Sequence, residues 1–148
     1  KIKSKIFALS EVGLQYVQLG QASNTLSGGE AQRIKLASFL SSSKIKQKKL
    51  FIFDEPTTGL HFHDVKKLIK ALQDLVEMGH HVIIIEHHMD IIKSADWIID
   101  LGPEGGNEGG TLLFEGNPDD FIKSDVLSYT KDYLKKCIEF RQPQIAHK

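Results

Sequence analysis

Two glycines lie between a serine and a glutamate at residues 27–30. Ser27 and Glu30 have the spacing of a capping box, in which the serine hydroxyl and the glutamate carboxylate each accept a free backbone N–H at the start of a helix. Because Gly28 and Gly29 would occupy the first turn, no side chain shields those N–H groups, and an anion can approach the positive end of the helix. This pattern predicts a phosphate-binding helix start. A capped helix with a flexible glycine lead-in is the alternative.

Two adjacent carboxylates, Asp54 and Glu55, follow an apolar run at residues 50–53. Open α/β sheets bind ligands at the carboxyl ends of their strands, so this pair is well placed for chemistry. Asp54 can hold Mg²⁺, usually through water because that ion sheds its hydration reluctantly, and Glu55 can orient and polarise an attacking water. Pro56 prevents the strand from continuing and fixes its exit. Two acids at a strand end are also compatible with an ordinary loop start.

His87 comes shortly after a second apolar run, at residues 82–85. If the two runs form neighbouring strands, His87 would lie beside Asp54 and Glu55, where it could donate a hydrogen bond to a terminal phosphate. A surface histidine is the alternative, and the adjacent His88 keeps that alternative open.

Two helices are expected around the glycine pair. Residues 4–19 carry apolar side chains at loosely helical spacing and precede a polar stretch at 20–25, which predicts a helix and then a loop. From residue 30 to 40 apolar side chains recur every three positions, which predicts an amphipathic helix. The polar side chains that fall outside its expected buried stripe are Gln32, Arg33 and Lys35.

The two apolar runs have the composition of strands buried on both faces of a parallel sheet. The helical stripe between them consists of Val65, Leu68, Ile69, Leu72, Leu75 and Val76. Gly79 is expected to cap that helix at its C-terminus. The alternation of strands and helices predicts an α/β fold with a mostly parallel sheet.

Further elements are expected toward the C-terminus. They are a short helix at 89–94, a strand at 97–101, a glycine-rich loop at 102–110, a strand at 111–114, a helical stretch at 119–136 and a frayed tail from Gln142. Trp97 is expected to be a core or half-buried packing residue rather than a base-stacking platform.

The composition is that of an ordinary globular chain. Its 148 residues are 41% hydrophobic, and 19 basic residues balance 19 acidic ones, so any contact with DNA would come from a local patch. Cys137 is the only cysteine, which excludes an internal disulfide and fits a reducing compartment. No apolar run approaches the roughly twenty residues that span a bilayer, and no charged-then-apolar leader opens the chain. We therefore expect a cytoplasmic chain, cut from a longer protein because it begins with Lys1.

Taken in order, the motifs resemble those of the ABC ATPase superfamily. The matching motifs are a signature motif at Leu26–Glu30, a Walker B strand at Leu50–Glu55, a D-loop at Thr57–His61 and a switch histidine at His87. Three segments, Leu26–Arg33, Asp54–His61 and Ala95–Gly106, are more similar to the bacterial UvrA family than to transport ATPases, and they look like its second nucleotide-binding domain. The resemblance covers residues 12–120.

The resemblance implies that ATP binds between the P-loop of one domain and the signature motif of another. Ser27 and Gly29 would then contact the γ-phosphate of a nucleotide held by a different domain. Glu55 and His87 would act catalytically, and Asp54 would hold magnesium, for the nucleotide held by this domain. The residues implied to contact nucleotide are Leu26, Ser27, Gly28, Gly29, Glu30, Asp54, Thr58 and Gly59.

The resemblance also implies partners. UvrA proteins carry two such domains in one chain, pair with a second copy, inspect double-stranded DNA for damage and pass lesions to the subunit UvrB in nucleotide excision repair, as part of the SOS response. A UvrA-like paralogue in drug resistance, the ATPase subunit of a transporter and a non-catalytic docking module are the alternatives.

The chain contains no G-x-x-x-x-G-K-S/T motif, so the P-loop lysine is absent. We therefore expect this chain alone to be inactive as an ATPase, although its parent would be active. The zinc modules of the family are expected outside it. Six histidines between His61 and His88 invite a metal interpretation, but they flank different helices and strands, which disfavours zinc.

The resemblance divides the chain into three regions. A signature-motif helical region would cover residues 1–49, the ATPase core from Walker B to the switch histidine residues 50–120, and a C-terminal helical tail residues 121–148.

Overall fold

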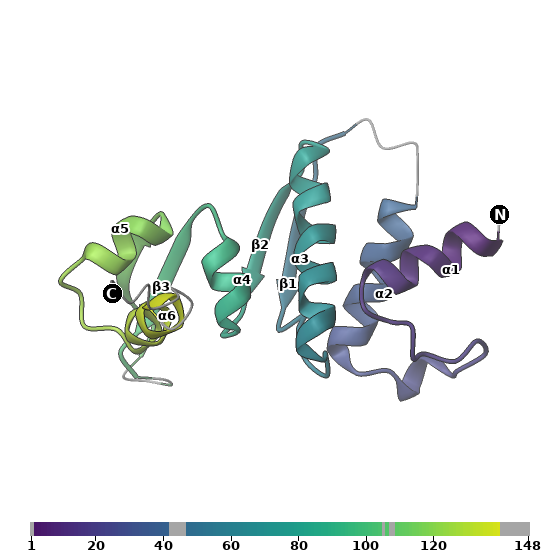
Figure 1. Ribbon diagram of the computed structural model, residues 1–148, viewed down its shortest axis with the longest axis horizontal. Coiled ribbons are helices and arrows are strands. Elements are labelled where there is room, and N and C mark those ends of the chain that lie inside the picture. The colour runs from purple at the N-terminus through teal and green to yellow at the C-terminus, as the bar shows by residue number, and fades with distance from the viewer. Residues whose placement is uncertain (1, 42–46, 105, 107–108, 140–148) are drawn as a thin grey trace, which may run out of the picture. The chain divides into compact units, whose positions relative to one another are not determined.

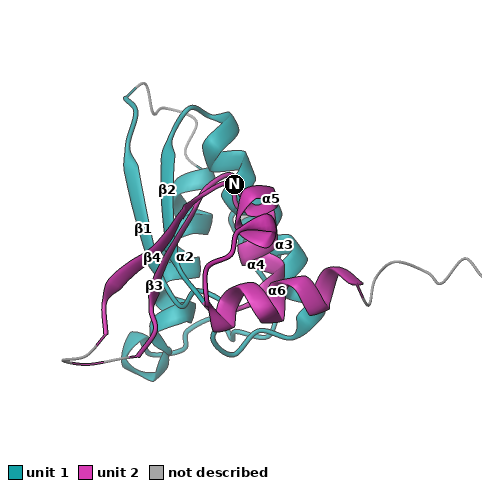
Figure 2. Ribbon diagram, turned by 90° about the vertical axis from the view of Figure 1, so that its left-hand side faces the viewer, with its two compact units in different colours: residues 1–86 teal, residues 87–148 magenta. Residues whose placement is uncertain are grey.

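A computed structural model describes residues 2–41, 47–104, 106 and 109–139. The chain forms two compact units, residues 1–86 and 87–148 (Figure 2). The first unit contains α1 (Ile2–Glu11), the short 3-10 helix η1 (Ser23–Thr25), α2 (Gly28–Leu40), β1 (Leu50–Asp54), α3 (Phe62–Glu77) and β2 (His81–Ile85) (Figure 1). The second contains α4 (Met89–Ser94), β3 (Ile98–Gly102), β4 (Thr111–Gly116), α5 (Pro118–Lys123) and α6 (Tyr129–Glu139).

The first unit is built on a parallel pair of strands, as the sequence predicts. β1 and β2 pair in register from Leu50 opposite His81 to Asp54 opposite Ile85. The crossover between them is α3, which runs alongside the strands (Figure 1). The carboxyl ends of both strands therefore lie at the same edge.

Only one face of this strand pair is covered by the described residues. Phe53 is buried on the covered face, and the ring of Phe51 packs edge-on against Phe39 of α2, with 4.5 Å between centroids. On the other face Leu50 and Ile52 are 57% and 62% exposed. The prediction of strands buried on both faces is therefore wrong for this chain.

α1 is shorter than the predicted helix at 4–19. It ends at Glu11, and Gly13 takes a left-handed conformation with φ of 77°. A Cβ at Gly13 would stand 2.9 Å from the Cβ of Asp64, so glycine permits a close approach to α3. This turn buries Val12 and Leu14, so their apolar character reflects burial after the helix rather than helical periodicity.

α3 follows its predicted stripe closely. Val65, Leu68, Leu72 and Leu75 are buried, whereas Val76 lies outside the buried face. Gly79 has a φ of 85° and donates its N–H to the carbonyl of Val76 at 2.8 Å, which confirms the predicted cap.

The second unit has an antiparallel pair, β3–β4. Its strands occur where predicted, but the mostly parallel sheet expected from sequence is confined to β1–β2. Three buried residues, Ile98, Phe121 and Leu134, form the centre of a core to which β4 and α4 also contribute. Trp97 is 60% exposed, so the prediction of a core or half-buried residue is wrong.

The helix predicted at 119–136 is two helices, α5 and α6. The buried hydroxyl of Ser128 donates to Asp100 Oδ2 at 2.6 Å and accepts from the Lys131 N–H at 3.1 Å. Ser128 thus starts a new helix and ties it to β3, which explains the interruption. The tail from Gln142 lies outside the described residues. Within the described part, no helix combines the length and apolar character needed to cross a membrane.

Candidate functional site

The start of α2 is the predicted capping box. Ser27 Oγ accepts from the Glu30 N–H at 3.3 Å, and Glu30 Oε2 accepts from the Ser27 N–H at 2.8 Å. The Tyr16 hydroxyl donates to Glu30 Oε1 at 2.7 Å. These donors, the Ser27 N–H first and then Tyr16, lower the pKa of the Glu30 carboxyl, while burial and then the bond to Glu30 raise the pKa of Tyr16. The Glu30 carboxylate therefore has a structural part in holding the helix start.

The two glycines of this helix start have different surroundings. A Cβ at Gly28 would meet nothing within 4 Å, so the backbone there is open to an approaching anion. Gly29 is buried, and a Cβ there would stand 3.3 Å from the carbonyl oxygens of Glu55 and Thr58. Gly28 therefore fits the predicted phosphate contact, whereas Gly29 lets α2 lie against the turn that follows β1.

Asp54 and Glu55 stand at the end of β1, as predicted, and both are exposed. The Glu55 N–H donates to the Ile85 carbonyl at 2.9 Å, which ties the turn to β2. Glu55 has a φ of 46°, a left-handed conformation that non-glycine residues rarely adopt. Such a conformation persists only where the surroundings hold it in place.

Gln32 holds the same turn from α2. Its Nε2 donates to the Asp54 carbonyl at 2.8 Å, and its Oε1 accepts from the Asp54 N–H at 3.0 Å. Helical periodicity places Gln32 outside the buried stripe and predicts no role for it.

Arg33 is fully buried, which corrects its predicted place outside the buried stripe. Its Nη1 donates to the carbonyls of Pro56 at 2.6 Å and Thr58 at 3.1 Å, and its Nη2 donates to the Tyr16 hydroxyl at 3.3 Å. A guanidinium carries several donors in a fixed plane, which suits a turn with carbonyls pointing inward. The available signal was Gly29, four residues earlier on the same helix face, because a glycine there allows the turn to approach.

The turn also contacts the residue that follows β2. The Thr57 N–H donates to the Glu86 carboxylate at 2.9 Å, and the Thr57 hydroxyl donates to the same oxygen. Thr58 and Gly59 are exposed beyond this contact, and Gly59 has a φ of 76°. The first unit thus brings the predicted signature residues and the predicted Walker B residues together through the turn at 54–58.

The two histidines after β2 can be distinguished in part. His88 Nδ1 accepts from the Asp90 N–H at 3.3 Å and caps α4. β1 and β2 are neighbours, which meets the condition on which the prediction for His87 rested. His87 is the first residue of the second unit, and its place beside Asp54 and Glu55 stays a prediction.

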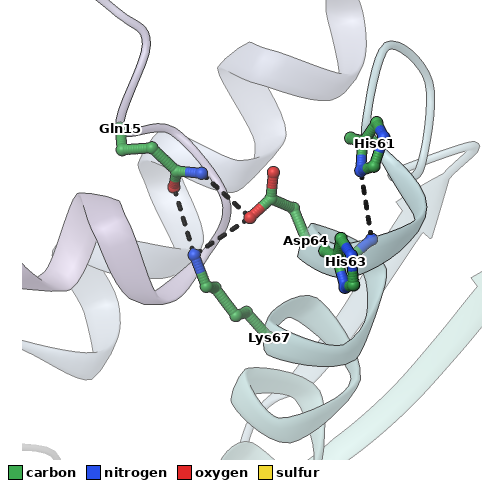
Figure 3. Close-up of polar contacts among 5 residues, drawn as sticks. All are labelled: Gln15, His61, His63, Asp64 and Lys67. Carbon is green, nitrogen blue, oxygen red and sulfur yellow. Dashed lines mark hydrogen bonds and ion pairs between the residues drawn. The ribbon is translucent and has the colours of Figure 1, made fainter.

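A second polar cluster joins the segment after α1 to the start of α3 (Figure 3). Gln15 Nε2 and Lys67 Nζ each lie 2.9 Å from Asp64 Oδ1, and they lower the pKa of Asp64, Gln15 first. His61 Nδ1 accepts from the His63 N–H at 3.5 Å and caps α3. Among the described residues, no group of three or more His, Cys, Asp or Glu side chains is arranged to hold a metal.

The residues at the turn and at the start of α2 fit a magnesium nucleotide by their chemistry. Exposed carboxylates such as those of Asp54 and Glu55 are the oxygen donors that Mg²⁺ prefers, and this ion keeps several waters. The open backbone at Gly28 offers N–H groups and the positive end of a helix dipole to a phosphate.

Comparison with known proteins points to one family. The chain is 51% identical over 140 residues to the UvrABC system protein A of Rhizobium meliloti (strain 1021), covering 95% of the chain and 14% of that protein. It is 57% identical over 138 residues to the protein of the same name from Clostridium acetobutylicum, covering 93% of the chain and 14% of that protein. The crystal structure of UvrA2 from Deinococcus radiodurans matches with a TM-score of 0.77 and 43% identity, covering 91% of this chain and 16% of that one. No protein-family model matches the chain.

The α/β fold and the capped glycine helix beside two strand-end carboxylates define a segment of an ABC-type ATPase domain. By its identity to these relatives the chain belongs to the UvrA family, and it spans about 14% of the length of the curated members it matches.

Proposed function

We propose that this chain contributes the signature motif and the Walker B carboxylates of an ATP-hydrolysing domain in a UvrA-type protein of nucleotide excision repair. The observation that carries the proposal is the turn at 54–58, which holds both predicted acids at a strand end and lies directly against the start of α2. In such a domain the strand-end carboxylates and the start of α2 would each serve the phosphates of a different nucleotide.

The chemistry proposed for Asp54 and Glu55 is supported by their position at the end of β1. Asp54 would hold Mg²⁺ through water, and Glu55 would orient and polarise the attacking water. His87 would donate a hydrogen bond to the terminal phosphate of the same nucleotide. The bound magnesium would neutralise charge that develops on the phosphate oxygens.

The start of α2 would serve a different nucleotide. Ser27 and the backbone at Gly28 and Gly29 would contact the γ-phosphate held by another domain, with Leu26, Glu30, Thr58 and Gly59 close by. The P-loop that completes each site would come from outside this chain.

At the level of the whole protein, we propose that ATP hydrolysis resets a dimer that inspects double-stranded DNA and passes damage to UvrB in the cytoplasm. Any zinc would belong to parts of the protein outside this chain. The curated relatives that match at 51% and 57% identity are named UvrABC system protein A, which supports the repair protein.

The test compares two carboxylate variants in a full-length protein that contains this chain. Glu55→Gln should bind ATP nearly normally but hydrolyse it about a hundredfold to ten-thousandfold more slowly, as expected for loss of a water-orienting group. The variant should also discriminate poorly between damaged and intact DNA, because without hydrolysis it would stay in the ATP-bound state. Asp54→Asn should fail earlier, with weakened magnesium-dependent nucleotide binding.

The matched control is Glu77→Gln, which neutralises an exposed glutamate at the end of α3. Binding of a fluorescent ATP analogue and steady-state hydrolysis would be measured for all three variants. Wild-type hydrolysis by Glu55→Gln would remove the Walker B assignment and the mechanism built on it.

A further inference from the structure

The side-chain amide of Gln32 pairs with both backbone groups of a single residue, Asp54. One bond runs from Gln32 Nε2 to the Asp54 carbonyl at 2.8 Å, and the other from the Asp54 N–H to Gln32 Oε1 at 3.0 Å. This pattern fixes the orientation of the amide. In a flipped amide, Nε2 would face the Asp54 N–H and Oε1 would face the Asp54 carbonyl, so neither hydrogen bond could form.

This pairing holds the edge of β1 that faces away from β2. The N–H and C=O of one residue in a strand point to the same side, and the sides alternate along the chain. The Glu55 N–H goes to Ile85 of β2 at 2.9 Å, whereas both groups of Asp54 go to Gln32. The end of β1 is therefore held by hydrogen bonds to β2 on one side and to Gln32 of α2 on the other.

Gln32 binds the residue directly before Glu55, whose backbone conformation is strained. Glu55 has a φ of 46°, and a left-handed conformation costs an L-residue about 1–2 kcal/mol. Arg33, the neighbour of Gln32 on α2, binds the carbonyl of Pro56 at 2.6 Å on the far side of Glu55. The direction in which the Glu55 side chain leaves the backbone thus depends on contacts before and after it.

We propose that Gln32 is a positioning residue for ATP hydrolysis, which fixes the backbone of Asp54, so sets the direction in which the Glu55 side chain projects, and does not itself contact the nucleotide. This inference rests on the proposed function. It also gives α2 a second task, because the helix that starts with the signature residues sets the direction of the Glu55 carboxylate.

The test is Gln32→Met in a full-length protein that contains this chain. Methionine keeps the length of the side chain and removes both hydrogen bonds. We expect kcat for ATP hydrolysis to fall about tenfold to a hundredfold, the size of effect that a displaced catalytic group produces. The KM for ATP should stay within about threefold, since no nucleotide contact is removed. Gln73→Met, which makes the same change at an exposed position of α3, should match the wild type.

A double-mutant cycle separates positioning from any independent role. If Gln32 acts through Glu55, then Gln32→Met should slow hydrolysis by less than about twofold in the Glu55→Gln background. A further tenfold loss in that background would overturn the inference. A wild-type kcat for Gln32→Met would also overturn it. So would a loss of ATP affinity by the same factor as the loss of kcat, together with a lower melting temperature, because that pattern indicates general structural damage rather than positioning.

The cycle also distinguishes the two proposals. Wild-type hydrolysis by Glu55→Gln removes the proposed function itself. A severe loss in Glu55→Gln together with wild-type behaviour of Gln32→Met removes only the role of Gln32.

Discussion

Single residues of similar type have different surroundings in this chain. His88 uses Nδ1 to accept the Asp90 N–H and so begins α4. A residue whose hydrogen bond starts a helix contributes mainly to stability. The structure thus assigns a capping role to His88, and the phosphate contact of His87 stays a prediction.

The histidine pair leads to a prediction about activity. In a full-length protein that contains this chain, His87→Ala should lower ATP hydrolysis at least about tenfold, because a charge-stabilising donor is lost. His88→Ala should cost about 1 kcal/mol of stability through the lost cap and leave kcat nearly unchanged. Steady-state hydrolysis and thermal unfolding would be measured for both variants, and the reverse ranking in kcat would show that the switch histidine is misassigned.

At the scale of elements, α2 organises the site. Its first residue, Gly28, offers open backbone, its second residue, Gly29, lets the turn at 54–58 approach, and Gln32 and Arg33 bind that turn. The helix is therefore both a candidate phosphate-binding element and the support for the strand-end carboxylates.

The two glycines of α2 should respond differently to the same substitution. Gly29→Ala places a methyl group 3.3 Å from two backbone carbonyls, which cannot move without shifting the turn, so we expect a loss of about 1–3 kcal/mol in stability and slower ATP hydrolysis. Gly28→Ala adds a methyl group to open space and should be neutral or stabilising by up to about 1 kcal/mol.

Thermal unfolding midpoints of the two alanine variants, measured in a full-length protein that contains this chain, provide the comparison. Equal midpoints would contradict the contact of Gly29 with the turn.

The sequence predicts the elements of the site better than the contacts between them. The capping box at Ser27 and Glu30, the strand before Asp54 and the cap at Gly79 rest on local rules of spacing and conformation, so each could be found from neighbouring residues. The roles of Gln32 and Arg33 depend on a turn more than twenty residues away. Helical periodicity assigns polar side chains to solvent. It cannot show that the backbone carbonyls of a distant turn lie beside the helix and accept hydrogen bonds from those side chains.

The same limit applies to the strands. The apolar runs at 50–53 and 82–85 predict buried strands, yet the described residues cover one face only. Composition reports that a strand needs burial on both faces, but it does not say which residues provide it.

At the scale of the whole molecule, each unit leaves large apolar side chains exposed on its sheet. They are Leu50, Ile52, Ile83 and Ile85 in the first unit and Ile99, Leu101 and Leu112 in the second. Contiguous exposed apolar surface of this kind marks places where other protein normally packs. This fits a segment that matches about 14% of its relatives' length.

The chain alone should not turn over ATP. Its sequence contains no P-loop motif, so it offers the proposed signature and Walker B residues without the lysine that grips the phosphates. Phosphate release from ATP and Mg²⁺ would be measured on the purified 148-residue chain and on its Glu55→Gln variant. A magnesium-dependent rate that disappears in the variant would contradict the prediction.

The left-handed backbone of Glu55 implies a conflict between stability and activity at one position. Glycine adopts this conformation without steric cost and asparagine with little, so either residue would relax the turn and raise the melting temperature. Neither has a carboxylate to polarise water. Selection for thermal stability alone would therefore be expected to remove the glutamate. Under the proposed function the less stable turn is retained because hydrolysis needs the Glu55 carboxylate.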